Sequence, residues 1–276
     1  MAVNPFYSYI VGADRPVGKH LMRTLAAEHL VYKGVAMESR ERFSLQATGQ
    51  PFFILTPSVY QPGDFDEAMS WVDIAEEHDA PVVLLSSLAV FNYDPKVRYS
   101  EEDDDWADTA MAHQLRALEQ RVAGCRRYII LRVGQQFSVQ FGDFAHNLLT
   151  RIREEHLVSV NDDKLFSPTP DDDIAAVIVA MLKQADCTDE LWGTYHFCGV
   201  DVVTPYSFAE ALLAEASQYE DLSEARLEIN PDGLAPALCA PNADLSNLFY
   251  TFGIKQKTWR HGLGRLVRRY YRAEES

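Results

Sequence analysis

Strand-like and helix-like segments alternate through the first half of the chain. Short apolar runs bounded by polar and turn residues are typical of buried strands, and apolar residues recurring at helical spacing are typical of helices that cover a sheet. The predicted strands are residues 6–12, 32–37, 52–57, 82–87 and 128–133, and the predicted helices between them are residues 17–29, 65–78 and 107–123. This order predicts an α/β fold with a Rossmann-like, doubly wound parallel sheet.

The second half of the chain continues with helices and fewer strands. The predicted helices are residues 144–154, 172–183, 207–217 and 259–271, and strand-like segments fall at residues 157–160 and 194–198. The polar residues 186–190 form only a loop, and no repeat or linker divides the chain. We therefore expect the 276 residues to form a single unit.

The chain carries an excess of negative charge. Its 41 acidic residues outnumber its 25 basic residues, which gives a net charge of −16. This balance argues against a nucleic-acid backbone or an anionic membrane surface as the main partner, because both repel an acidic protein. It does not exclude an anionic cofactor, since a helix N-terminus binds phosphate locally whatever the global charge.

The sequence shows no sign of a secreted, membrane-spanning or metal-binding protein. Its four cysteines are widely spaced, without a C-x-x-C or a Cys/His cluster, so we expect reduced thiols and no metal site. The first residues lack the basic region of a signal peptide, and no apolar run is long enough for a transmembrane helix. These features predict a cytoplasmic protein without a membrane partner.

A glycine turn joins the first predicted strand to the first predicted helix. Gly12 and Gly18 take the first and third positions of a dinucleotide-binding turn, where one allows the tight turn and the other allows close helix–strand packing. Arg15 takes the second position, at which a bare backbone lets a pyrophosphate approach the amides. An arginine there can instead pair with a phosphate. The turn is compatible with NADP or NAD binding and equally with a plain strand-to-helix connection.

Two charged residues follow the second predicted strand. Glu38 is placed to hydrogen-bond an adenosine ribose, which favours NAD, whereas Arg40 is placed to hold the 2′-phosphate of NADP. The two residues therefore favour different cofactors. Plain surface charge after a strand is the simpler interpretation of both.

Several motifs share their order and spacing with a known family. They are Ser86-Ser-Leu-Ala-Val-Phe91, Tyr99-Ser-Glu-Glu-Asp103, Leu131-Arg-Val133, Ser167-Pro-Thr-Pro-Asp-Asp-Asp-Ile-Ala175, Gly193-Thr-Tyr-His-Phe-Cys-Gly199 and Thr251-Phe-Gly-Ile254. Together they resemble the RmlD-like (dTDP-4-dehydrorhamnose reductase-like) branch of the extended short-chain dehydrogenase/reductase family. The resemblance runs from residue 6 to about residue 268. It implies a dinucleotide-binding core of about residues 1–135 plus returning segments, and a smaller, mostly substrate-binding C-terminal lobe of about residues 136–276.

The resemblance also implies an active centre that this chain does not keep. In the family, a Ser or Thr after the fourth strand orients the sugar carbonyl, a Tyr supplies the proton, and a Lys lowers the pKa of the Tyr and holds the nicotinamide ribose. Ser87 matches the first position, whereas Met111 and Leu115 stand at the Tyr and Lys positions. A thioether and an isobutyl group have no proton to transfer. A positioned general acid contributes about 10²–10⁴ in rate, so we expect little reductase activity by the usual route.

No neighbouring side chain is a clear replacement for the missing pair. His113 lies two residues after the Tyr position and so points to another side of the helix. Tyr93 and Tyr99 follow the fourth strand, where packing on the surface is the simpler interpretation. Thr56 and Pro57 replace the small residues that usually let the nicotinamide pass, and proline lacks an amide donor.

Three further polar groups have simple structural interpretations. The consecutive acids at residues 101–105 are more typical of a solvated loop than of a metal site. His196 falls in a buried strand pattern, which is typical of a core histidine. Asp171, Asp172 and Asp173 stand at the start of a predicted helix, where acidic residues cap the helix and complement its dipole.

Two functions are compatible with this sequence. We favour a non-catalytic or catalytically impaired protein that binds a nucleotide, a sugar nucleotide or a protein partner as a sensor, scaffold or regulatory subunit. The alternative is an active NAD(P)-dependent sugar-nucleotide reductase or epimerase that uses an altered proton donor. The resemblance further implies a homodimer that pairs through the helices flanking residues 107–123.

Overall fold

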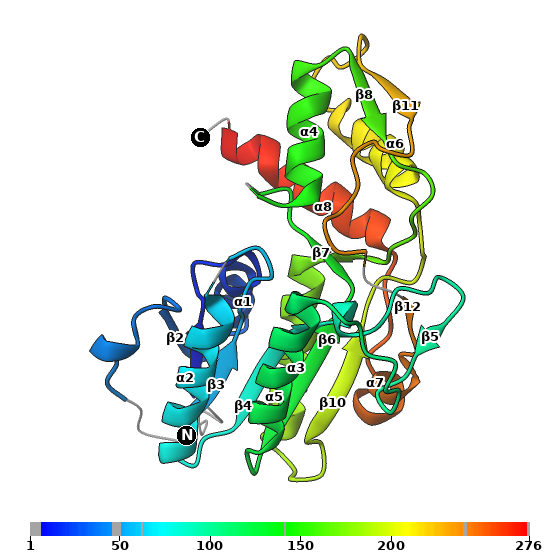
Figure 1. Cartoon of the computed structure of the whole chain (residues 1–276). Coiled ribbons are helices and arrows are strands. Elements are labelled where there is room, and N and C mark those ends of the chain that lie inside the picture. The colour runs from blue at the N-terminus through cyan, green and yellow to red at the C-terminus, as the bar shows by residue number, and fades with distance from the viewer. Residues whose placement is uncertain (1–6, 46–50, 62, 141, 240–241, 275–276) are drawn as a thin grey trace.

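The computed structural model describes residues 7–45, 51–61, 63–140, 142–239 and 242–274. Six parallel strands form the central sheet in the order β10-β6-β4-β3-β1-β2 (Figure 1). Their bounds are β1 Tyr7–Val11, β2 Val31–Val35, β3 Pro51–Leu55, β4 Val82–Ser87, β6 Tyr128–Val133 and β10 Gly193–Phe197. The predicted Rossmann-like parallel sheet is therefore confirmed; residue 6, at the start of the first predicted strand, lies outside the described residues.

Helices cover both faces of this sheet. On one face α1 (Pro16–Ala27) packs against α5 (Asp171–Ala185), and on the other α2 (Asp64–Glu77) packs against α3 (Ala110–Ala123). This doubly wound arrangement places the N-termini of the helices at the carboxyl ends of the strands (Figure 1).

Each face of the sheet has its own apolar core. Successive residues of a strand point to opposite faces, so Tyr9 and Val11 pack in the core beneath α2 and α3, whereas Ile10 packs beneath α1 and α5. In α1, Leu21 and Leu25 are fully buried and lie four residues apart, which makes the apolar stripe that a sheet-covering helix needs.

A smaller lobe stands beyond the carboxyl end of β6 (Figure 1). It contains α4 Phe144–Glu154, β8 Leu157–Val160, α6 Pro205–Ala216, β11 Arg226–Ile229 and α8 Trp259–Glu274. These elements enclose a third apolar core in which Phe208 and Trp259 are fully buried. Between β8 and α6 the chain returns to the sheet through α5 and β10.

Several short elements escape prediction from sequence. They are η1 Arg40–Arg42, η2 Leu88–Val90, β5 Arg98–Tyr99, β7 Gln135–Phe137, β9 Pro168–Pro170, β11 Arg226–Ile229, β12 Asn242–Ala243 and α7 Ser246–Phe252. Pieces of two to four residues are too short to show a period, α7 spans only about two turns, and the strands among them pair with segments remote in sequence.

The longer elements agree with prediction at their centres and differ at their ends. The helix predicted at residues 107–123 begins at Ala110, because the Thr109 hydroxyl caps it by accepting from the Ala112 amide at 3.1 Å. The helix predicted from residue 172 begins at Asp171. In the part of the chain that the structure describes, no helix is both long and apolar enough to cross a membrane.

Candidate functional site

A cavity opens at the carboxyl ends of β1 and β3. Strand β1 has β2 on one side and β3 on the other, so the loops after β1 and β3 diverge at this point. Such a switch point is where ligands bind in open parallel sheets. The cavity has a volume of about 290 Å³ and lies between the β1–α1 turn, the β3–α2 loop, the segment from β7 to α4 and the start of α5.

Gly12 and Gly18 are required by the β1–α1 turn itself. Gly12 has a φ of +87°, and a Cβ atom there would approach Thr56 Oγ1 to 2.7 Å. A Cβ atom on Gly18 would lie 2.1 Å from the Gly12 carbonyl oxygen. The Thr56 hydroxyl donates to the Val11 carbonyl at 2.9 Å and so ties β3 to the turn. These contacts account for both glycines without a cofactor.

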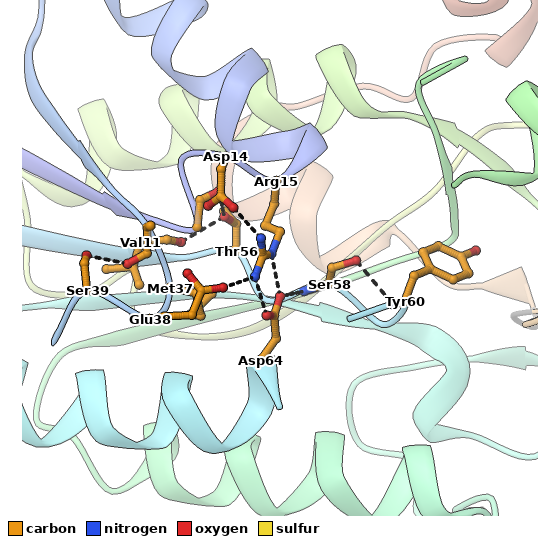
Figure 2. A network of polar contacts seen from close by, with 12 residues as sticks. Val11, Asp14, Arg15, Met37, Glu38, Ser39, Thr56, Ser58, Tyr60 and Asp64 are labelled. Atoms are coloured by element: carbon orange, nitrogen blue, oxygen red, sulfur yellow. Dashed lines mark hydrogen bonds and ion pairs between the residues drawn. The ribbon is translucent and has the colours of Figure 1, made fainter. Parts of the chain in front are cut away.

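Arg15 is the centre of an ion-pair network beside this turn (Figure 2). Its guanidinium donates to both carboxylate oxygens of Asp64, from Nε at 2.9 Å and from Nη2 at 2.7 Å. Nη2 also donates to Glu38 Oε1 at 2.8 Å, and Nη1 donates to Asp14. Asp64 further accepts from the Ser58 amide at 2.8 Å. The hydrogen bond to Asp64 is the main reason that the pKa of Arg15 is raised.

The surroundings of the turn fit the phosphates of a dinucleotide poorly. A helix N-terminus binds phosphate through free amides and a positive field. Pro16 is the first residue of α1 and has no amide hydrogen, and the Arg15 amide is already donated to the Gly12 carbonyl at 2.9 Å. The Arg15 side chain forms ion pairs with three carboxylates. Its positive charge is therefore already neutralised and is not available to bind a phosphate.

Four of the five residues predicted to bind a cofactor come together here. Gly12, Arg15, Gly18 and Glu38 all belong to the turn and its ion-pair network. Arg40 is exposed in η1 and does not line the cavity. Sequence reasoning missed Asp64, which lies 49 residues from Arg15 and carries no local signal of its role.

Two buried carboxyl groups lie on the lobe side of the cavity. Asp143 caps α4 by accepting from the His146 amide at 2.7 Å, and it also accepts from the Ser138 amide at 2.7 Å and the Ser138 hydroxyl at 2.8 Å. Asp171 is only 2% exposed, and its Oδ1 has no hydrogen-bond partner among the described residues. Burial raises the pKa of Asp171 well above its usual range, and the negative charge of Asp143 raises it further.

The three aspartates at the start of α5 differ in their contacts. All three lie in the first turn, as predicted, but the N-cap is Pro170, which provides no side-chain hydrogen bond. Asp172 and Asp173 both accept from Arg265 of α8, at 3.0 Å and 2.9 Å. Asp171 is the aspartate of this turn that lines the cavity.

A second buried polar cluster joins α3 to β4 and β6. Arg132 donates to both carboxylate oxygens of Glu119, at 2.9 Å and 2.7 Å, and the Ser86 hydroxyl donates to Glu119 Oε1 at 2.5 Å. His196 is fully buried beside Arg132, and burial lowers the pKa of His196 to about 3. His196 is therefore the core histidine that the sequence predicts. Glu119 was missed, although it lies one helical turn after Leu115 on the same face of α3.

The loop between β4 and α3 is more ordered than its sequence predicts. The rings of Phe91 and Tyr99 stack with centroids 4.6 Å apart, and the Tyr99 hydroxyl donates to Asp105 at 2.6 Å. Glu101 accepts from the His196 amide at 3.0 Å, and burial raises the pKa of Glu101. Tyr99 is only 1% exposed, so the expectation of a surface aromatic was wrong for this residue. Two members of the acidic run at residues 101–105, Glu101 and Asp105, thus make hydrogen bonds that stabilise the loop. The described residues contain no cluster of acidic, His or Cys side chains that could hold a metal ion.

Two other candidate proton donors lie outside the cavity wall. His113 is exposed and pairs with Asp108, with Nε2 and Oδ1 3.1 Å apart. The Tyr93 hydroxyl accepts from the Leu165 amide at 2.6 Å and fastens the β4–α3 loop to the lobe. Neither His113 nor Tyr93 lines the cavity at the switch point.

Comparison with known proteins identifies the family. The family model described as the RmlD substrate binding domain matches residues 65–272. The chain belongs to this family. A dTDP-4-dehydrorhamnose reductase of Aggregatibacter actinomycetemcomitans is 29% identical over 142 residues, which cover 49% of this chain and 48% of that protein. The enzyme of the same name from Sinorhizobium fredii is 25% identical over 211 residues, 73% of this chain and 70% of that protein.

Solved structures of RmlD-type reductases share the fold. The structure of a dTDP-4-dehydrorhamnose reductase from Clostridium acetobutylicum has a TM-score of 0.77 at 15% identity and covers 96% of this chain and 99% of its own. That of the Bacillus anthracis reductase in complex with NADP has a TM-score of 0.74 at 20% identity, with coverage of 95% and 98%. At sequence identities of 15% and 20%, the structural similarity establishes a shared fold and no more than that. The Aggregatibacter match spans about half the length of that relative.

The two residues predicted to stand at the family's tyrosine and lysine positions are packing residues. Leu115 is only 2% exposed and belongs to the core beneath α2 and α3, and Met111 packs half-buried against the same core. Ser87 lies at the end of β4, where its hydroxyl accepts from the Ala89 amide at 3.1 Å and caps η2. Helix α3 contacts η2, the short helix that Ser87 caps.

Tyr60 is a phenol in the wall of the cavity, but its chemistry differs from that of an RmlD-family proton donor. Its hydroxyl accepts from Gln135 Nε2 at 2.7 Å. Burial raises the pKa of Tyr60 to about 12, and the charges of Asp143 and Asp171 act in the same direction. In the family, a lysine lowers the pKa of the tyrosine. Tyr60 therefore has the opposite electrostatic environment.

Proposed function

We propose that this protein is an RmlD-family ligand-binding protein that recognises a sugar nucleotide or a nucleotide in a regulatory or scaffolding role, without reducing it. The observation that carries the proposal is the apolar packing of Met111 and Leu115, the residues that the motif spacing predicts at the family's proton-donor and lysine positions. A positioned general acid supplies about 10²–10⁴ in rate, and neither side chain can act as one.

The environment of the glycine turn supports the same proposal. Arg15 is paired with Asp64, Glu38 and Asp14 at the place where a dinucleotide would put its pyrophosphate. Pro16 removes an amide from the same helix N-terminus. The residues predicted for proton transfer and those predicted for cofactor binding therefore both differ from the family pattern. We expect such a double difference in a protein whose function needs neither step.

We also propose that the two parts of the molecule have different binding functions. About residues 1–135 with the returning α5 and β10 correspond to the dinucleotide-binding core, and about residues 136–276 form mostly the substrate-binding lobe. Support comes from the separate apolar core of the lobe, which contains Phe208 and Trp259. A homodimer through the helices flanking α3 remains a prediction of the family resemblance.

An active reductase or epimerase is the second candidate, because the curated relatives of this chain are named dTDP-4-dehydrorhamnose reductases. That function would use NADP or NAD and a different proton donor. Tyr60 is the phenol placed in the cavity, and its raised pKa makes it a weak acid at neutral pH.

The two candidates are separated by binding and turnover measured on the same protein. We would titrate the chain with dTDP, dTDP-glucose, NADPH and NADH, following intrinsic fluorescence and thermal stability, and would then monitor oxidation of either cofactor in the presence of dTDP-4-dehydrorhamnose. The proposal expects binding of the dTDP compounds without cofactor oxidation. Sustained oxidation that depends on the keto sugar would establish the reductase instead. Absence of binding by any nucleotide would leave only a protein partner.

A further inference from the structure

Asp171 is a buried acid without a counter-charge in the wall of the switch-point cavity. Its side chain is 2% exposed, and Oδ1 has no hydrogen-bond partner among the described residues. Its neighbours Asp172 and Asp173 are both paired with Arg265, so the lack of a cation at Asp171 is not shared by the rest of the turn. A buried carboxylate is strongly unfavourable unless a cation or a proton neutralises it.

The groups around Asp171 do not supply that cation. Asp143 is nearby, but its oxygens already accept hydrogen bonds from Ser138 and His146, and it adds negative charge. Asp172 adds negative charge as well, and the Tyr60 phenol carries none while its proton is retained. The Ser138 hydroxyl, whose hydrogen bond lowers the pKa of Asp171, is uncharged, so the groups that act most strongly on Asp171 are acidic or neutral.

Of the two basic residues that line the cavity, one is paired with other carboxylates and the other is exposed to solvent. Arg15 is shared among Asp14, Glu38 and Asp64, and Lys19 is exposed to solvent. The field inside the cavity is therefore negative at the glycine turn, where Asp14, Glu38 and Asp64 outnumber Arg15, and beside Asp143 on the lobe side. Such a field repels phosphate and attracts a cation.

The rest of the wall is suited to a sugar. Neutral hydrogen-bonding side chains line the cavity from both sides, and apolar groups lie between them. The polar members are Ser58, Tyr60, Gln61, Gln136 and Gln140, and Pro57 and Phe137 are among the apolar ones. Ligand sites of this kind combine apolar surface with a few placed polar groups.

We propose that this cavity binds a sugar that carries a protonated amine, with the ammonium group held by the Asp171 carboxylate. The ligand would occupy the place in the fold where a dinucleotide phosphate would otherwise lie. A sugar hydroxyl can also hydrogen-bond to the Asp171 carboxyl group, but only a cation can replace the proton that neutralises this group when no ligand is bound, and charge-assisted hydrogen bonds are the stronger ones. The inference rests on the proposed sugar-nucleotide binding and deepens it by naming the class of sugar.

The test uses two probes that differ in a single substituent. Glucosamine and glucose would be compared on the intact protein by saturation-transfer NMR and calorimetric titration, with inorganic pyrophosphate as the anionic probe. We expect glucosamine to bind about tenfold more tightly than glucose or better, as one charge-assisted hydrogen bond implies, and pyrophosphate to leave glucosamine binding unchanged.

Matched variants assign the effect to one carboxyl group. Asp171→Asn keeps the shape of the side chain and should abolish the preference for the amine, whereas Asp172→Asn, the neighbouring carboxylate paired with Arg265, should keep it. Thermal unfolding of each variant shows that it is folded. An amine preference that survives in Asp171→Asn, equal binding of the two sugars, or binding of neither sugar would overturn the inference. Competition by pyrophosphate would overturn it as well.

The outcomes also separate this inference from the proposed function. If dTDP-glucose binds but glucosamine shows no advantage over glucose, the proposed function stands and the amine site is wrong. If the protein oxidises NADPH with a keto sugar while Asp171 still confers the amine preference, the proposed function is wrong and the amine site stands.

Discussion

At the scale of single residues, Asp171 has a protonation state that links folding to pH. Its pKa in the folded protein lies well above the usual value of 3.8, mainly because of burial and then because of Asp143. The folded state thus keeps a proton that the unfolded chain releases near pH 4, so the contribution of this group to stability falls as pH rises from about 4 through the folded pKa.

Asp171→Asn should therefore gain stability relative to the natural protein as pH rises. The asparagine does not titrate, so we expect the difference in free energy of unfolding to grow by up to about 1.4 kcal/mol per pH unit across that range. Urea unfolding at a series of pH values measures this difference. A difference that stays constant with pH would show that Asp171 is ionised in the folded protein.

Arg15 is the residue on which the ion-pair network depends. Its replacement by alanine leaves Asp64, whose side chain is 4% exposed, with the Ser58 amide as its one hydrogen-bond donor among the residues that the structure describes. We expect Arg15→Ala to lower the free energy of unfolding by about 3 kcal/mol, because an unpaired buried carboxylate remains. Arg40→Ala, an exposed arginine, should change it by less than about 0.5 kcal/mol.

A double-mutant cycle tests the physical cause of this loss. Asp64→Asn removes the buried charge, so the combination with Arg15→Ala should recover most of the stability. Strictly additive losses in the double variant would show that the Arg15–Asp64 contact contributes little.

At the scale of elements, α3 is held to the sheet by its apolar face. Leu115 and Leu118 are buried in the same core, and Thr109 caps the helix in the usual way. The helix was predictable because its apolar period and its cap are local properties. The buried contact of its Glu119 with Arg132 was not, because it depends on how α3 lies across β6.

This packing role predicts the cost of restoring the family lysine. Leu115→Lys places an ammonium group in an apolar core and should destabilise the protein by about 3 kcal/mol or more, whereas Leu115→Met, which conserves volume, should cost less than about 1.5 kcal/mol. Chemical denaturation of the two variants measures both. Equal stability of Leu115→Lys and the natural protein would mean that the lysine reaches the cleft, and the family chemistry would then be restorable by substitution.

At the scale of the whole molecule, the switch-point cavity is built from segments that lie far apart in the chain. The switch point brings the β1–α1 turn and the β3–α2 loop together, and α5 arrives from the other half of the sequence. The negative field of the cavity is a property of that assembly and belongs to no single motif.

This assembly predicts how dinucleotide binding can be restored. Arg15→Gly together with Asp64→Asn removes the guanidinium and its buried partner and frees Glu38 to hydrogen-bond a ribose. We expect NADH to bind this variant about tenfold more tightly than it binds the natural protein, and more tightly than NADPH, whose 2′-phosphate faces Glu38. Cofactor fluorescence measures both affinities, with Arg40→Gly as the control. Tight binding of NADH by the natural protein would contradict this account of the turn.

The sequence by itself determined the sheet and its main helices and the glycine turn, and it predicts Met111 and Leu115 at the positions of the family's Tyr–Lys pair. These are local patterns, because the periodicity of apolar residues and the spacing of a motif are readable along the chain. Only the tertiary structure decided that Arg15 is neutralised by Asp64, that Tyr99 is buried, and that Asp171 Oδ1 has no hydrogen-bond partner in the described part of the chain. Ion pairs and burial depend on groups that are remote in sequence and close in space, so no local sequence pattern predicts them.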